Sequence, residues 1–282
     1  MLNKLLQYAP VQILSALSVF ALIALQTKLL ALEEYGVLAI FMLIIEVVRS
    51  FSFQWINSSL LRLYPSRNKC EKVSYLTSSF SIIITLLFPA VLLIAGAIFF
   101  YDSFSLKILL LLTFLMFIKA LYLFFLDLSR LDERLLRYRL ASILQAVSAV
   151  ICTFYLLNLS PLLESALYAL ILSYIFSLPI LLIKVKISWF ENNKLTKEIV
   201  SYGAPLMISG VMATLASRVD RLFISSEIGL IETGLYSGIS NLLLGVISLV
   251  FVIVALPLYP ELTKSIPDKA LLKVLHQSML IH

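Results

Sequence analysis

The chain has 282 residues, of which 61% are apolar and 13% are charged, and its mean hydropathy is +1.02. These values lie outside the range of soluble domains and indicate an integral membrane protein. The net charge of +6 does not indicate a nucleic-acid-binding protein, because the basic residues lie in short connections between apolar segments and not along one soluble face.

The sequence offers few residues for metal, redox or acid–base chemistry. Cys70 lies in a basic loop and Cys152 in an apolar segment, so neither a disulfide framework nor a metal site is indicated. The only histidines, His276 and His282, lie in the last seven residues, which disfavours a zinc cluster or a central histidine base. We therefore expect no cofactor, no metal site and no catalytic residue.

Eight apolar segments are long enough to cross a membrane, which takes about 20 residues of helix. Their continuous Leu/Ile-rich runs predict helices, because barrel strands would alternate between apolar and polar residues. The first segment is too long for a signal peptide and lacks a small-residue cleavage site, so we expect it to be retained. The predicted spans are approximately 9–31, 36–60, 75–100, 104–127, 137–158, 162–184, 203–225 and 234–259.

The distribution of basic residues predicts the orientation of these spans. Sixteen Lys and Arg residues lie on the side of the N-terminus and of every second connection, against four on the opposite side. This bias predicts a cytoplasmic N-terminus. The outward connections, near 32–35, 101–103, 159–161 and 226–233, are short, which leaves no room for an extracytoplasmic catalytic domain.

Two dipeptides recur at a spacing of 195 residues and suggest an internal repeat. Ala9-Pro10 is matched by Ala204-Pro205, and Tyr64-Pro65 by Tyr259-Pro260, each pair at the same topological place. We expect a first six-helix bundle over 1–187, a cytoplasmic linker over 188–202, and the start of a second, parallel bundle over 203–282 with two transmembrane helices and a cytoplasmic tail. On this interpretation the all-α chain is truncated relative to a parent of twelve or more helices, or is an unusual short form.

Several short motifs resemble those of a known transporter family. They are Leu-Ala-Leu-Glu-Glu-Tyr-Gly at 30–36, Leu61-Arg62, Tyr202-Gly203-Ala204-Pro205, Ser217 to Arg221, Gly229 and Gly234-Leu235-Tyr236-Ser237. The chain thereby resembles the polysaccharide and O-antigen flippases of the multidrug/oligosaccharidyl-lipid/polysaccharide exporter superfamily. The resemblance implies a MATE-like fold of two six-helix bundles around a central cavity that opens alternately to the two sides. The implied substrate is an undecaprenyl-pyrophosphate-linked oligosaccharide, turned over for O-antigen or capsule assembly in the bacterial cytoplasmic membrane.

Ionisable residues inside the spans are candidates for substrate binding, because a charge at mid-bilayer costs about 2.5–3.5 kcal/mol on insertion scales. Glu46 and Arg49 lie near the centre of the second span and share a helix face; they either face a cavity or neutralise each other as a structural pair. Lys28, near the outer end of the first span, is expected to snorkel unless its stripe with Gln12 and Gln26 faces the cavity. Lys119 lies deeper, in the fourth span, and is a candidate for either role.

A second candidate cluster consists of Arg218, Asp220 and Arg221 at the end of the seventh span. Arginine suits phosphate because its planar fork donates two parallel hydrogen bonds to oxyanion oxygens. The alternative is an interfacial cluster that anchors the helix end. Arg49 and the two arginines of this cluster would form a cationic lining for a pyrophosphate head group if the second and seventh helices meet across the cavity.

The leading hypothesis is a flippase whose partners are the lipid-linked oligosaccharide, membrane lipids and proteins of polysaccharide assembly, without nucleic acid. Proton or cation coupling would involve Glu46, Asp127 or Asp220, among which the sequence does not choose. One alternative is an ion-coupled multidrug exporter of the same fold, which the basic character of the intramembrane residues disfavours. A membrane polysaccharide polymerase or ligase is disfavoured by the short outward connections, and a non-transporting remnant or scaffold is suggested only by the apparent truncation.

Overall fold

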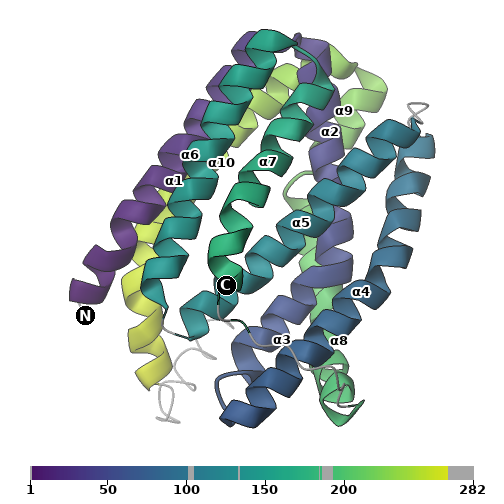
Figure 1. Ribbon diagram of the computed structural model, residues 1–282. Helices are drawn as coiled ribbons and strands as arrows, with labels where there is room; N and C mark the ends of the chain where they lie inside the picture. The colour runs from purple at the N-terminus through teal and green to yellow at the C-terminus, as the bar shows by residue number, and fades with distance from the viewer. Residues whose placement is uncertain (1, 101–104, 133, 184, 186–192, 266–282) are drawn as a thin grey trace, which may run out of the picture.

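The computed structural model describes residues 2–100, 105–132, 134–183, 185 and 193–265, and these residues form helices and no strand (Figure 1). Helices are expected because a chain inside lipid must satisfy its backbone hydrogen bonds internally. The elements in chain order are α1 (Leu2–Leu29), α2 (Leu32–Arg49), the π-helical turn η1 (Ser50–Gln54), α3 (Trp55–Leu63), α4 (Lys69–Phe100), α5 (Leu106–Leu131), α6 (Leu135–Leu159), α7 (Leu163–Leu182), α8 (Asn193–Ala216), α9 (Asp220–Glu227) and α10 (Leu230–Ser265).

Among the described residues, seven helices are long and apolar enough to cross a membrane. The second of the predicted spans is one continuous rod, Leu32–Leu63, made of α2, η1 and α3. The first predicted span falls in α1, whose described apolar stretch, Ile13–Leu29, is shorter than the other seven. The structure therefore confirms an all-helical membrane protein with about the predicted number of spans.

The helices run alternately up and down, so their connections gather at two ends (Figure 1). The connections after α1, α6 and α9 lie at the upper end of the view, and those after α3 and α5 lie at the lower end. The alternation agrees with the predicted order of spans, and the cytoplasmic side of the molecule stays a prediction. The predicted outward connection at 101–103 lies outside the described residues.

Helices that are far apart in the sequence pack together. α10 packs against α1 and α2, while α8 packs against η1, α3 and α4. At two of these contacts the helices approach so closely that only glycine fits. Small residues allow such close packing between membrane helices. A Cβ added to Gly36 of α2 would lie 2.0 Å from the carbonyl oxygen of Leu230, and one added to Gly203 of α8 would lie 2.2 Å from the ring of Trp55 in α3. These contacts fix α10 and α8 against the N-terminal helices.

Two expectations for the seventh segment are wrong. α8 begins at Asn193, inside the predicted linker 188–202, because Leu195 and Ile199 lie four residues apart on one face and are both buried. The segment is also not one continuous helix, because α8 ends at Ala216 and a turn at 217–219 precedes α9. Residues 186–192 and the predicted tail 266–282 lie outside the described residues, and the division into two bundles stays a prediction.

Side-chain hydroxyls bond back to the backbone beside the break between α8 and α9. The hydroxyl of Thr214 donates to the carbonyl of Gly210, at 2.9 Å, and the hydroxyl of Ser217 donates to the carbonyl of Thr214, at 2.9 Å. Such side-chain bonds compete with the helical ladder and bend helices. The next backbone bond, from the N–H of Arg218 to the carbonyl of Leu215 at 3.0 Å, spans three residues and tightens the turn. Arg218 therefore lies in an interruption between two helices.

Candidate functional site

A cavity of about 520 Å³ lies between α1, α2 and α10, with α5, α7 and the α8–α9 turn closing its sides. Its α2 wall extends from Tyr35 to Glu46, eleven residues along the helix or about 16 Å at about 1.5 Å per residue. Most of the lining is apolar. Its polar and charged members are Ser15, Gln26, Tyr35, Glu46, Lys119, Arg218, Arg221 and Asn241.

Glu46 and Lys119 line the part of the cavity that lies near the middle of the spans Leu32–Leu63 and Leu106–Leu131. The ammonium of Lys119 donates to one carboxylate oxygen of Glu46, and Arg49 binds the other at 2.9 Å. The Glu46 side chain is 12% exposed and the Lys119 side chain 16%. Glu46 is therefore a largely buried carboxylate held by two cations.

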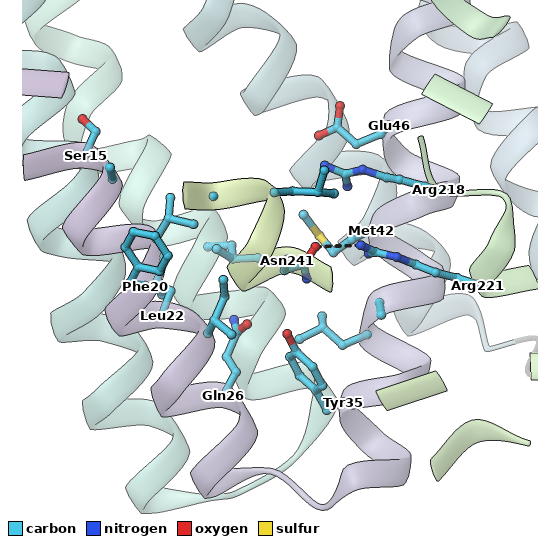
Figure 2. A pocket seen from close by; sticks show the side chains of 18 of the residues that line it. Ser15, Phe20, Leu22, Gln26, Tyr35, Met42, Glu46, Arg218, Arg221 and Asn241 are labelled. Atoms are coloured by element: carbon cyan, nitrogen blue, oxygen red, sulfur yellow. Dashed lines mark hydrogen bonds between the residues drawn. The ribbon is translucent and has the colours of Figure 1, made fainter. Parts of the chain in front are cut away.

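Arg221 of α9 is the most buried charged residue of the described core, with 1% exposure. Its guanidinium Nη2 donates to the side-chain oxygen of Asn241 in α10 at 2.7 Å, while its Nε has no hydrogen-bond partner. Tyr35 of α2 lines the same cavity. Figure 2 shows these three side chains converging on the cavity. Arg221 thus joins α9 to α10, beside Tyr35 of α2.

Arg218 reaches the cavity from the α8–α9 turn, on the same side as Arg221 (Figure 2). Within the described part of the chain its guanidinium makes no hydrogen bond or ion pair with another side chain. The lining carries three cations, Lys119, Arg218 and Arg221, against the single carboxylate of Glu46. The cavity therefore has a surplus of positive charge and one guanidinium that is available to an anion.

The other three predicted site residues lie outside this lining. Arg49 lies at the start of the π turn, where its guanidinium binds Glu46 and donates to the side-chain oxygen of Gln54 at 3.2 Å. The carboxylate of Asp220 accepts hydrogen bonds from the Tyr236 hydroxyl and from the N–H of Arg221, the latter at 2.9 Å. Lys28 is exposed.

The second and seventh segments meet, because α2 packs against α8 and α9. Arg218 and Arg221 therefore lie in the same cavity as Glu46, whereas Arg49 binds Glu46 from outside the lining. Glu46 and Arg49 form an ion pair, and Glu46 also lines the cavity. Lys119 joins this ion pair from α5.

Three neutral polar residues of the lining, Gln26, Tyr35 and Asn241, are not among the predicted site residues. In the sequence, Gln26 is part of a stripe with Gln12 and Lys28, and Tyr35 is part of the motif at 30–36. Asn241 follows Ser240 in α10, next to an apolar run. Uncharged amides occur in several predicted spans, so the sequence alone does not single out Gln26 and Asn241.

Two of the motifs that resemble the family, 30–36 and 234–237, meet where α2 packs against α10. Within 30–36, Tyr35 lines the cavity and Gly36 contacts the backbone of α10, including Gly234. Within the second motif, Tyr236 binds Asp220. Glu34 accepts a hydrogen bond of 2.9 Å from the N–H of Leu163, which places a carboxylate at the N-terminus of α7. These motifs therefore join α2 to α7, α9 and α10.

Comparisons with known proteins agree with this description. Residues 25–280 match the family described as "Polysaccharide biosynthesis protein". The structure is similar to the crystal structure of MATE in complex with MaD3S, with a TM-score of 0.53 and 15% sequence identity, covering 84% of this chain and 63% of that chain. At this identity the likeness establishes the fold alone, and the chain spans less than two thirds of that protein's length. No curated protein matches the sequence significantly.

Proposed function

Because the chain belongs to the polysaccharide biosynthesis protein family, we propose that it is a flippase for undecaprenyl-pyrophosphate-linked oligosaccharide repeat units in O-antigen or capsule assembly. It is a multi-pass membrane protein of polysaccharide biosynthesis with a MATE-like transporter fold. The bacterial cytoplasmic membrane is its proposed location, with polysaccharide-assembly proteins as neighbours.

The observation that carries the proposal is the surplus of positive charge in a mid-membrane cavity. Cations inside a membrane are costly, so a site with three of them and one carboxylate favours an anionic ligand. Arg218 and Arg221 would bind the pyrophosphate, since guanidinium groups match its oxygens. Lys119 would add charge from α5. The polyprenyl chain would stay in the lipid while the polar head group crosses inside the protein.

Among the carboxylates considered for proton or cation coupling, Glu46 is the one that lines the cavity. Asp220 is engaged by Tyr236 and Arg221, and Asp127 lies in the last part of α5, where it binds Asn57 at 3.3 Å and Arg130. We therefore propose Glu46 as the coupling group. Because Lys119 and Arg49 both bind this carboxylate, a proton or cation would have to displace one of them, and a displaced Lys119 would be available to the substrate.

The test deletes the chromosomal gene and measures in which leaflet of the membrane the lipid-linked intermediate accumulates. Loss of a flippase should leave single repeat units on the cytoplasmic leaflet and remove surface polysaccharide, and the restored wild-type gene should reverse both changes. Single units on the outer leaflet would instead indicate a polymerase or ligase. Unchanged polysaccharide together with increased sensitivity to cationic drugs would indicate a multidrug exporter.

A further inference from the structure

A second polar part of the cavity lies where α1 ends and α2 begins, and its side chains Gln26 and Tyr35 are uncharged. Gln26 lies in the last turn of α1 and Tyr35 in the first turn of α2, and both line the cavity. They are 9% and 3% exposed, so both are almost fully buried. Figure 2 shows the Gln26 amide and the Tyr35 hydroxyl directed into the same space, away from Glu46.

The hydrogen-bonding capacity of this second part is incompletely used. Within the described residues, the side-chain amide of Gln26 makes no hydrogen bond, although the residue is almost fully buried. The oxygen of Asn241 already accepts from Arg221, and its amide NH₂ and the Tyr35 hydroxyl belong to the same lining. Buried polar groups need partners, so this part of the cavity is suited to a polar ligand.

We propose that Gln26 and Tyr35 form a subsite for the first sugar of the substrate, next to the cationic part that binds the pyrophosphate. An amide offers both donors and an acceptor, and the phenol offers a donor, which together match sugar hydroxyl groups. Gln26 and Tyr35 carry no charge themselves, unlike Glu46 and Lys119 at the other end. The cavity volume, about 520 Å³, lies within the range of about 300–1,000 Å³ for small-ligand sites, so it suits a head group with its first sugar and not a long glycan. This inference rests on the proposed function.

The test compares two lipids on the purified protein in nanodiscs. The probes are undecaprenyl pyrophosphate and undecaprenyl-pyrophosphoryl-N-acetylglucosamine, with dissociation constants measured by native mass spectrometry. Gln26→Leu should weaken binding of the sugar-bearing lipid about 2- to 10-fold, the range for one lost hydrogen bond. It should leave binding of the sugar-free lipid within about twofold of wild type. Tyr35→Phe should act in the same direction.

Two controls separate this inference from the proposed function. Thr27 lies outside the lining, and its hydroxyl donates to the carbonyl of Ile23 at 2.8 Å, so Thr27→Val should change neither constant. Arg218→Ala should weaken both lipids equally. Equal weakening of both lipids by Gln26→Leu, or no weakening of either, would overturn the sugar subsite. Failure of the wild-type protein to bind either lipid would overturn the proposed function itself.

Discussion

The carboxylate of Glu46 in α2 is shared between Lys119 of α5 and Arg49 of its own helix. One carboxylate therefore balances two cations near the middle of the membrane, and it links a cavity residue to the π turn that follows Arg49. Turns of this kind inside helices often mark functional sites. The chain of contacts from Lys119 to Gln54 connects the cavity to the point where α2 continues into α3.

Removal of the shared carboxylate should destabilise the protein more than removal of either cation. Glu46→Gln leaves Lys119 and Arg49 without their counter-charge and should lower the free energy of unfolding by about 3 kcal/mol, the lower end of the range for a broken buried pair. Lys119→Met should cost less, because Glu46 keeps Arg49. The double variant Glu46→Gln/Lys119→Met should be more stable than Glu46→Gln. Denaturant unfolding in detergent checks this, and strictly additive losses would contradict the coupling.

Substitutions of Arg218 and of Arg49 should reduce transport to different extents. Arg218 lines the cavity without a side-chain partner among the described residues, whereas Arg49 lies outside the lining and binds Glu46. Arg218→Ala should abolish surface polysaccharide at normal membrane levels of the protein, and Arg218→Lys should restore part of it because the charge remains. Arg49→Ala should reduce polysaccharide less. Quantitative blotting of surface polysaccharide and of the protein provides the measurement, and equal losses in Arg49→Ala and Arg218→Ala would contradict the assignment.

The sequence predicted the spans well because length and hydropathy are local properties of a segment. Its errors lie where local composition misleads. Residues 193–202 are polar enough to suggest a linker, but the buried pair Leu195 and Ile199 continues α8 through them. The break at 217–219 lies beside hydroxyl groups that bond back to the helix, and an apolar average does not detect it.

The candidate site could be predicted only in part, because the packing of helices distant in the sequence decides which residues share the cavity. A charge within a span is visible in the sequence, so Glu46, Lys119, Arg218 and Arg221 were found. Which of them share one cavity depends on α10 packing against α1 and α2, and on the α8–α9 turn reaching α2. The sequence left open whether Arg49 faces a cavity or pairs with Glu46, because the π turn that provides Gln54 as a second partner is not visible in it.

The glycine contacts should be sensitive to a single added methyl group. Gly36→Ala would place a Cβ 2.0 Å from the carbonyl oxygen of Leu230, so α2 and α10 must separate. We expect a loss of about 1–3 kcal/mol in the free energy of unfolding, as for other overpacked contacts. Gly96→Ala in α4 is the matched control, because its Cβ would meet nothing within 4 Å and alanine favours helix by about 0.5–1 kcal/mol. A stable Gly36→Ala protein would contradict the close contact between α2 and α10.

The two native cysteines report the orientation of the chain. Cys70 is exposed at the start of α4, next to the connection that we predict to be cytoplasmic, whereas Cys152 lies inside the span of α6. Maleimides react with thiolates in water, so a membrane-impermeant maleimide should label Cys70 in spheroplasts only after permeabilisation and should leave Cys152 unlabelled. In a Cys70→Ser background, Pro161→Cys, in the opposite connection, should be labelled without permeabilisation. The reverse pattern would mean that the chain is inserted the other way, and the positive-inside assignment from its basic connections would be wrong.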